Sequence, residues 1–273
     1  MDPNRLDGLD SGERCACLIA ERVLQGVEAE AWDVEGRQGA VDAMLTYAPG
    51  RRAAFEVTVL AADGALQSEG ILHQSDYQWA NPGQWSWSIA IAKPEDIPRL
   101  RSLYGEIILR CEAAGAVRPE QLQWDLHQRD EDLRWLVEES DSEMHGHPVV
   151  AAREGDKVRD VMVTPRGRGG GTDDSLDGLH AALEEAFLRP HMAKHVKKLA
   201  AAEADERHLF VPVHMSALPF PVFYGLAFGT QLPREAPPSP APVTHLWLAP
   251  SHSRRVLLYD ADNGWKQYEP YNN

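Results

Sequence analysis

Two acidic side chains, Asp42 and Glu56, stand inside segments whose residue pattern is otherwise typical of β-strands. Residues 41–47 and 53–60 each alternate between two faces, and a carboxylate inside a strand is disfavoured by propensity and by desolvation. Cross-strand neighbours lie about 5 Å apart, so two ionised carboxylates there repel each other, and a hard divalent cation relieves the repulsion. The pair suggests a Mg²⁺ or Mn²⁺ site suited to hydrolysis of a phosphodiester; the alternative is a hairpin whose polar face meets solvent.

The turn between the two strands decides whether such a site can form. It contains Pro49 and Gly50, which are turn formers. If the loop holds an odd number of residues, for instance 48–50, Asp42 lies opposite Glu56 and both side chains share one face of the sheet. An even loop would direct them to opposite faces, because a shift of one residue reverses every side chain. The site therefore requires an odd loop.

Asp42, a hairpin of suitable length and the tripeptide Glu-Val-Thr at residues 56–58 resemble the PD-(D/E)XK nuclease superfamily, whose members have the restriction-endonuclease-like fold. Residues 32–42 and the acidic first helix also resemble those of actinobacterial-type members. The resemblance implies that Asp42 and Glu56 hold the metal. It also implies that a glutamate on the first helix assists them, and Glu21 is the best match.

The chain departs from the superfamily pattern at Thr58. In that superfamily a lysine at this position, two residues after the glutamate, steadies the attacking water, whereas a threonine hydroxyl carries no positive charge. Some members resemble this chain in having moved the lysine to a later helix, and the candidates here are Lys194, Lys197 and Lys198. Thr58 itself is expected to contact substrate.

Four further residues are candidates for binding a phosphate-bearing substrate. Arg37 and Gln38 precede the first strand of the hairpin; Arg37 could bind a phosphate or pair with an acidic neighbour, and Gln38 could bond substrate or water. Arg166 and Arg168 lie in a glycine-rich segment without the GK[ST] ending of a phosphate loop. That segment is either an arm that contacts a nucleic-acid backbone or a simple crossover.

Other polar and aromatic clusters have simpler interpretations. His191 and His195 share a helix face but lack the glutamate of a HExxH zinc helix, and residues 145–147 (His-Gly-His) are expected to form a loop. Trp85 and Trp87 could stack on bases, but their spacing matches the period of a strand, which favours packing in the core.

The length of 273 residues with 43% hydrophobic content is sufficient for one large domain. We expect an α/β fold with a central mixed β-sheet flanked by helices, in which residues 11–214 form a restriction-endonuclease-like core. Residues 215–273 are expected to extend the sheet and include the proline-rich connection 233–242. The periodicity predicts helices at residues 11–26, 94–114, 130–140 and 175–202, the last broken at Pro190, and strands at 85–92, 157–164, 208–214, 244–248 and 255–259.

The net charge of −15 argues against binding nucleic acid through bulk electrostatics. Residues 187–202, however, carry four basic side chains and no acid, so a DNA or RNA contact there stays open. No apolar run reaches the about 20 residues that cross a membrane, and the start of the chain lacks the features of a signal peptide. With three cysteines in no framework spacing, this indicates a cytoplasmic protein. Two hypotheses remain: a Mg²⁺-dependent nuclease, or a non-catalytic module of the same fold that binds nucleic acid or a protein partner.

Overall fold

The computed structural model describes residues 4–34, 37, 39–48, 50–148, 160–166 and 174–271. The chain divides into two compact units: unit 1 comprises Met1–Ala61 and Gly169–Asn273, and unit 2 comprises Ala62–Arg168. Each unit has its own sheet and its own hydrophobic core among the described residues. This division is finer than the single domain with a core at 11–214 that the sequence led us to expect.

Unit 1 is built on one mixed sheet. Its strands are β1 (Val27–Ala31), β2 (Ala43–Tyr47), β3 (Arg52–Val57), β8 (Glu206–Val213), β9 (His245–Pro250), β10 (Val256–Asp260) and β11 (Gly264–Tyr268). They lie in the order β1-β2-β3-β8-β9-β10-β11, with β3, β8 and β9 parallel to one another and the other neighbours antiparallel. Parallel neighbours require a crossover, and the crossover from β3 to β8 contains all of unit 2.

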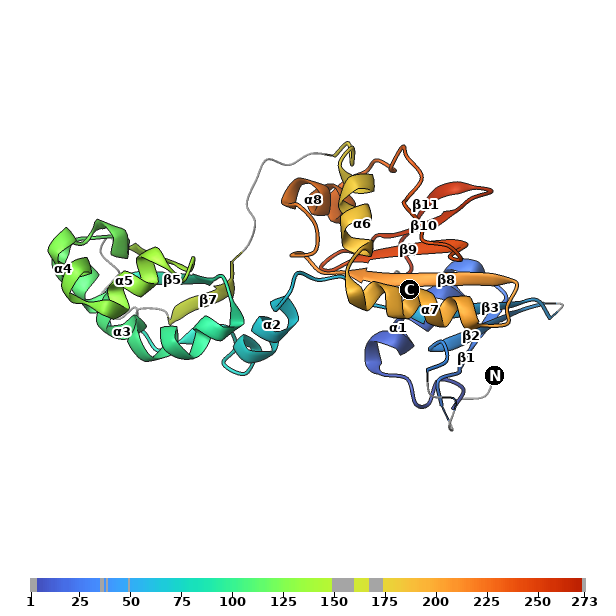
Figure 1. The fold of residues 1–273 in the computed structure, drawn as a ribbon, viewed down its shortest axis with the longest axis horizontal. Helices are drawn as coiled ribbons and strands as arrows, with labels where there is room; N and C mark the ends of the chain where they lie inside the picture. The colour runs from blue at the N-terminus through green and yellow to red at the C-terminus, as the bar shows by residue number, and fades with distance from the viewer. Residues whose placement is uncertain are drawn as a thin grey trace. The chain divides into compact units, whose positions relative to one another are not determined.

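Helices cover both faces of this sheet (Figure 1). Helix α1 (Ser11–Leu24) packs on one face with Leu45, Phe55 and Trp247. Helices α6 (Leu179–Phe187), α7 (Pro190–Ala201) and α8 (Phe220–Phe228) pack on the other face with Met44 and Ala54. Because side chains alternate along a strand, even-numbered residues of β2 and β3 face α7 and odd-numbered ones face α1.

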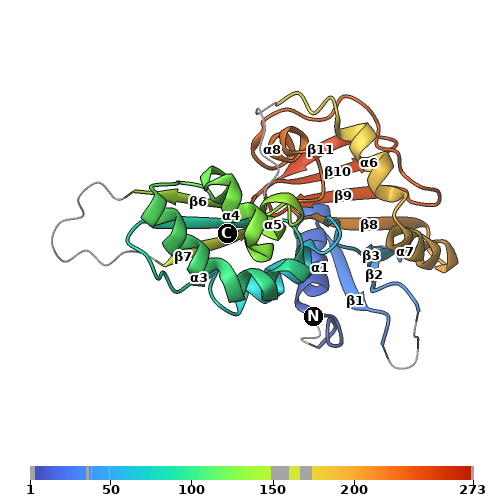
Figure 2. The same cartoon turned by 60° about the vertical axis from the view of Figure 1, so that its left-hand side comes forward.

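Unit 2 carries a second sheet of four strands (Figure 2). Its strands are β4 (Gln78–Trp79), β5 (Ser86–Ile91), β6 (Glu143–His147) and β7 (Val161–Pro165), in the order β4-β7-β5-β6. Its helices are α2 (Ala65–His73), α3 (Ile97–Ala114), α4 (Trp124–Arg129) and α5 (Glu131–Glu138), with 3₁₀ turns η1 (Pro94–Asp96) and η2 (Pro119–Gln121). Trp87 is buried in its core and Trp85 packs against that core while partly buried, as their strand spacing favoured.

The α/β class and the mixed sheet flanked by helices are confirmed. Strands β9 and β10 extend the sheet of the earlier strands, as expected for residues 215–273. Residues 145–147 were expected to form a loop, which was wrong, because they belong to strand β6. Strand β5 was expected in a single central sheet but lies in the second sheet. The edge strand β1 was not predicted.

The first helix begins at Ser11, where the sequence predicts it, and Asp10 is its N-cap. The Asp10 side chain accepts from the Glu13 backbone N–H, and the Glu13 side chain accepts in return from the Asp10 backbone N–H. Among the described helices, none combines the length and apolar composition needed to cross a bilayer.

Candidate functional site

The register of the β2–β3 hairpin brings Asp42 opposite Glu56. Ala43 pairs with Phe55 in the antiparallel ladder, so the preceding residue, Asp42, faces Glu56. The strands close at Tyr47, whose backbone N–H donates to Arg51 O at 2.8 Å, which leaves a three-residue connection. The odd loop is therefore confirmed.

Each carboxylate of the pair is fixed by one backbone N–H group. Val57 N donates to Asp42 Oδ2 at 2.7 Å, and Asp42 N donates to Glu56 Oε2 at 3.1 Å. One oxygen of each carboxylate, Asp42 Oδ1 and Glu56 Oε1, remains for other partners. These two atoms point toward helix α7, because both residues occupy even-numbered positions of the hairpin.

Helix α7 supplies the positive partner of both free oxygens. Lys198 Nζ lies 3.0 Å from Glu56 Oε1 and 3.3 Å from Asp42 Oδ1, and a third carboxylate, that of Asp33, lies 3.7 Å from the same nitrogen. His195, one turn earlier, places Nδ1 2.6 Å from Glu56 Oε1. The tautomer with the ring proton on Nδ1 donates a hydrogen bond to this carboxylate oxygen.

The centre of this cluster is buried and its rim is partly open. Glu56 has a side-chain exposure of 0%, Asp42 of 8%, Lys198 of 14% and His195 of 23%. Burial raises the pKa of Asp42 to about 6, with a further increase from the charge of Glu56, while the Val57 N–H and Lys198 oppose the rise. Burial alone would lower the pKa of Lys198, but its hydrogen bonds and charge interactions with Glu56 and Asp42 raise it overall.

The two free oxygens of the pair are of the kind that hard divalent cations bind. Two carboxylate oxygens that are free of backbone donors already converge on one positive charge, the ammonium of Lys198. Mg²⁺ is commonly bound through one or two carboxylates, with water and substrate oxygens completing its shell. Asp42 and Glu56 could therefore hold such an ion if the ammonium moved away from them, for instance toward Asp33.

Of the three lysines considered for the absent motif lysine, the structure brings one to the pair. Lys194 and Lys197 lie on the exposed side of α7, whereas Lys198 lies against the sheet. Thr58, which was expected to contact substrate, is a buried residue with 5% exposure, and its hydroxyl donates to Met192 Sδ at 3.9 Å.

Glu21 does not join the cluster, contrary to expectation. Its carboxylate accepts from the Ala29 backbone N–H at 2.7 Å and pairs with Arg5 at 2.9 Å. The reason is the packing of α1, which covers the face of the sheet opposite the one that carries the carboxylate pair.

The other substrate candidates are distributed over the chain. Arg37 is exposed and places its guanidinium carbon 4.0 Å from the centre of the Trp32 ring. Arg166 belongs to unit 2, where it pairs with Glu143 at 2.7 Å and also donates to the carbonyl of Asp141. Gln38 and Arg168 lie outside the described residues.

Sequence reasoning missed His195 and Asp33 as members of the cluster. A signal for His195 existed, because Met192 and Leu199 mark the buried stripe of α7 and His195 lies between them at helical spacing. Asp33 carried no such signal, since it follows strand β1 in an irregular segment.

A second cluster, formed by Glu206, His208 and His245 of unit 1, could hold a metal ion, because its ligand atoms lie within 4.8 Å of one another. The two imidazoles stack with a centroid distance of 4.0 Å and an interplanar angle of 13°. An imidazole binds a metal in its ring plane, so stacked rings must turn before both bind one ion.

The hydrogen bonds of His208 favour a different role for this second cluster. Trp247 Nε1 donates to His208 Nδ1 at 3.2 Å, which leaves the ring proton on Nε2, 3.2 Å from Glu206 Oε2. Burial lowers the pKa of His208 to about 4, so the ring is neutral at pH 7. Both ring nitrogens of the buried His208 are thus hydrogen-bonded, while Glu206 and His245 are partly exposed.

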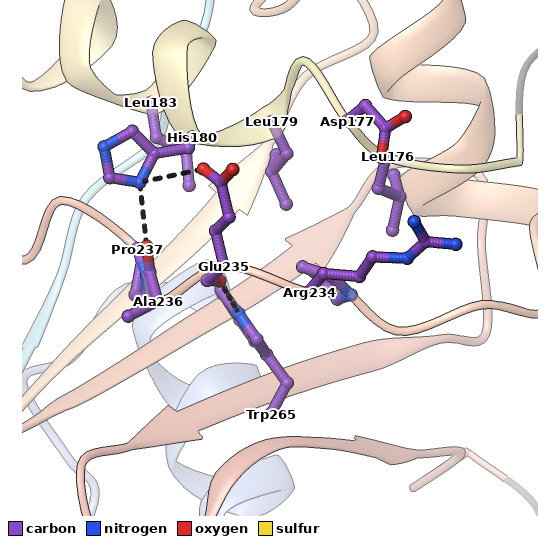
Figure 3. Close-up of a pocket in the computed structure, with 11 residues that line it drawn as sticks. Leu176, Asp177, Leu179, His180, Leu183, Arg234, Glu235, Ala236, Pro237 and Trp265 are labelled. Carbon is purple, nitrogen blue, oxygen red and sulfur yellow. Dashed lines mark hydrogen bonds and ion pairs between the residues drawn. The ribbon is translucent and has the colours of Figure 1, made fainter.

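A cavity of about 170 Å³ lies between α6 and residues 233–237 (Figure 3). Its polar groups engage one another: His180 Nδ1 lies 2.8 Å from Ala236 O and 3.9 Å from Glu235 Oε2, and Trp265 Nε1 donates to Glu235 O at 2.7 Å. None of the site residues predicted from the sequence lines this cavity.

Comparison of the chain with protein-family models, curated proteins and solved structures finds no match. The functional inference therefore depends on the geometry of the carboxylate pair and its partners on α7.

Proposed function

We propose that this protein is a Mg²⁺- or Mn²⁺-dependent phosphodiester hydrolase, a nuclease with a restriction-endonuclease-like core in unit 1. The observation that carries the proposal is the convergence of Asp42 Oδ1 and Glu56 Oε1 on the ammonium of Lys198. The resemblance to the PD-(D/E)XK superfamily implies a site with two carboxylates and one lysine. In this chain Thr58 holds the usual sequence position of that lysine, and Lys198 supplies the lysine from a later helix.

In this proposal each residue of the cluster has a distinct task. Asp42 and Glu56 are the ligands of the cation, and their backbone hydrogen bonds orient them before it arrives. His195 holds Glu56 by its Nδ1–H, and Lys198 provides a positive charge beside the reacting phosphate. Such fixed donors and charges stabilise a transition state because they need no reorganisation during the reaction.

The cation, when bound, would supply Lewis-acid stabilisation of the phosphate and activation of water. The low exposure of Glu56 and Asp42 favours hydrogen bonds and charge interactions that are stronger than in water. The partly exposed side chains of Lys198 and His195 form the side of the cluster from which a phosphate could approach.

One observation favours a second function, a non-catalytic module of the same fold. Lys198 already pairs with both carboxylates, and buried ion pairs of this kind also occur as structural features. In that case Asp42 and Glu56 only stabilise the hairpin against α7, and the protein binds nucleic acid or a protein partner without cleaving it.

Calorimetric titration with Mn²⁺ and a cleavage assay on labelled DNA and RNA separate the two functions. We expect one Mn²⁺ site that is lost in Glu56→Gln and kept in His245→Gln, a control for the second cluster. Asp42→Asn should abolish cleavage while circular dichroism shows an intact fold. Cleavage that survives Asp42→Asn, or Mn²⁺ binding that survives Glu56→Gln and is lost in His245→Gln, would contradict the proposal.

A further inference from the structure

Two arginine guanidinium groups lie over the indole ring of Trp32. The guanidinium carbon of Arg37 lies 4.0 Å from the ring centre and that of Arg52 lies 4.8 Å from it. Because both distances are measured to one point, the two carbons are at most about 9 Å apart, within the range of appreciable charge repulsion. Two like charges are thus held close together on one aromatic ring.

No carboxylate of the described residues neutralises this arginine pair, Arg37 and Arg52. Neither guanidinium forms an ion pair or a hydrogen bond with a described residue. Asp205 accepts from the backbone N–H of Arg52 at 3.0 Å, and Asp33 faces Lys198. Within the described part of the chain this arginine pair has no acidic partner, and in a protein with a net charge of −15 such a pair would suit an external anion.

The arginine pair lies on the same face of the sheet as the carboxylate pair. Trp32 N donates to Asp42 O at 2.8 Å, and the Trp32 ring packs against the core on the α7 side. Arg52 and Glu56 are both even-numbered residues of β3, so their side chains leave the strand on one face, from Cα atoms about 13 Å apart. The guanidinium of Arg52 extends from its end of this span to the ring of Trp32.

We infer that Arg37 and Arg52, stacked on Trp32, bind a phosphate of a nucleic-acid strand whose neighbouring phosphate lies at Asp42 and Glu56. Guanidinium groups match phosphate oxygens with paired hydrogen bonds, and stacking on an indole orients them with little loss of entropy. The inference rests on the proposed function and adds residues that hold the substrate strand beside the carboxylate pair, namely the two arginines stacked on Trp32.

The test measures binding of a fluorescein-labelled oligonucleotide by anisotropy, in EDTA so that cleavage does not interfere. The wild-type chain is compared with the double variant Arg37→Gln/Arg52→Gln across a series of salt concentrations. Each lost phosphate contact reduces the slope of log K against log salt by about 0.7 for a single strand. Because the two arginines share one phosphate in this inference, we expect a slope about 0.7 smaller in magnitude for the double variant.

A matched control removes two positive charges elsewhere in unit 1. Arg234→Gln/Lys266→Gln makes the same change in net charge near strand β11, at the opposite edge of the sheet from β1. This control should keep the wild-type slope. A wild-type slope in Arg37→Gln/Arg52→Gln, or an equal reduction in the two double variants, would overturn the inference. Because these measurements use no metal, their outcome is separate from that of the Mn²⁺ titration.

Discussion

Replacement of Lys198 by methionine should convert an ammonium-neutralised cluster into one that depends on a divalent cation. Methionine keeps most of the length and the apolar stem of lysine but removes its charge. In the wild-type chain the ammonium lies 3.0 Å from Glu56 Oε1 and 3.3 Å from Asp42 Oδ1, the two atoms that the cation requires. The ammonium and the cation therefore compete for the same oxygens.

The size of the effect follows from the charges. A single and a double positive charge about 4 Å apart repel by about 2 kcal/mol at the permittivity of water, and by more in a partly buried site. Movement of the ammonium toward Asp33, 3.7 Å away, would relieve part of this repulsion in the wild type. Since 1.4 kcal/mol is a factor of ten, we expect the Kd for Mn²⁺ to fall at least about tenfold in Lys198→Met.

The same substitution should destabilise the metal-free fold. Removing one partner of a buried ion pair leaves uncompensated charge and typically costs about 3 to 5 kcal/mol. Saturating Mn²⁺ should restore most of that loss, because a ligand that binds only the folded state raises its stability. If Lys198 acts beside the reacting phosphate, the variant should bind Mn²⁺ more tightly and yet cleave more slowly.

Calorimetry with Mn²⁺ and thermal unfolding in EDTA and in Mn²⁺ measure these effects. Lys194→Met and Lys197→Met are the controls, because both lysines are exposed on the same helix and should change neither quantity. An unchanged or weaker Mn²⁺ affinity in Lys198→Met would refute the reasoning that the cation occupies the position of the ammonium.

Two further predictions concern the same cluster. The pKa of Asp42 is raised from 3.8 to about 6, so the folded state holds a proton that the unfolded chain releases between these values. In metal-free buffer Asp42 should therefore lower the free energy of unfolding by about 3 kcal/mol as the pH rises from about 4 to 6. Denaturant titrations of Asp42→Asn should lack this pH dependence. Equal pH profiles of the wild type and the variant would contradict the prediction. His195→Leu removes the donor to Glu56 Oε1 and should weaken Mn²⁺ binding about 10- to 100-fold, whereas His195→Asn keeps an N–H near the position of Nδ1 and should stay within a few-fold of wild type. Equal Mn²⁺ affinities of these two variants in calorimetry would show that the hydrogen bond does not position Glu56.

The carboxylate hairpin is a feature that the sequence alone could define. Strict alternation on both sides of a turn assigns each side chain to a face, and an odd loop then places Asp42 opposite Glu56. Helix α3 and the break between α6 and α7 at Pro190 could also be predicted from the sequence, because the signals of periodicity, glycine and proline act within a few residues.

The division into two units could not be predicted from local patterns. Strand β5 alternates in the same way whether it joins the first or the second sheet, because alternation reports a buried face and not the strand that pairs with it. Strand β1 pairs with β2 over only five residues, and so short a segment gives a weak pattern.

The sequence by itself determined that two carboxylates stand in alternating strands on either side of a turn, where an odd loop would bring them to one face, and that lysines are available on a later helix. The register of the hairpin then placed both carboxylates on one face. Only the tertiary structure decided that Lys198 and His195 reach Glu56, while Lys194 and Lys197 face away and Glu21 pairs with Arg5. The physical reason is that the rotation of α7 about its axis, and the face on which α1 packs, are set by the burial of apolar side chains across the whole sheet. That burial is a property of contacts between residues far apart in the chain, which spacing along the sequence does not encode.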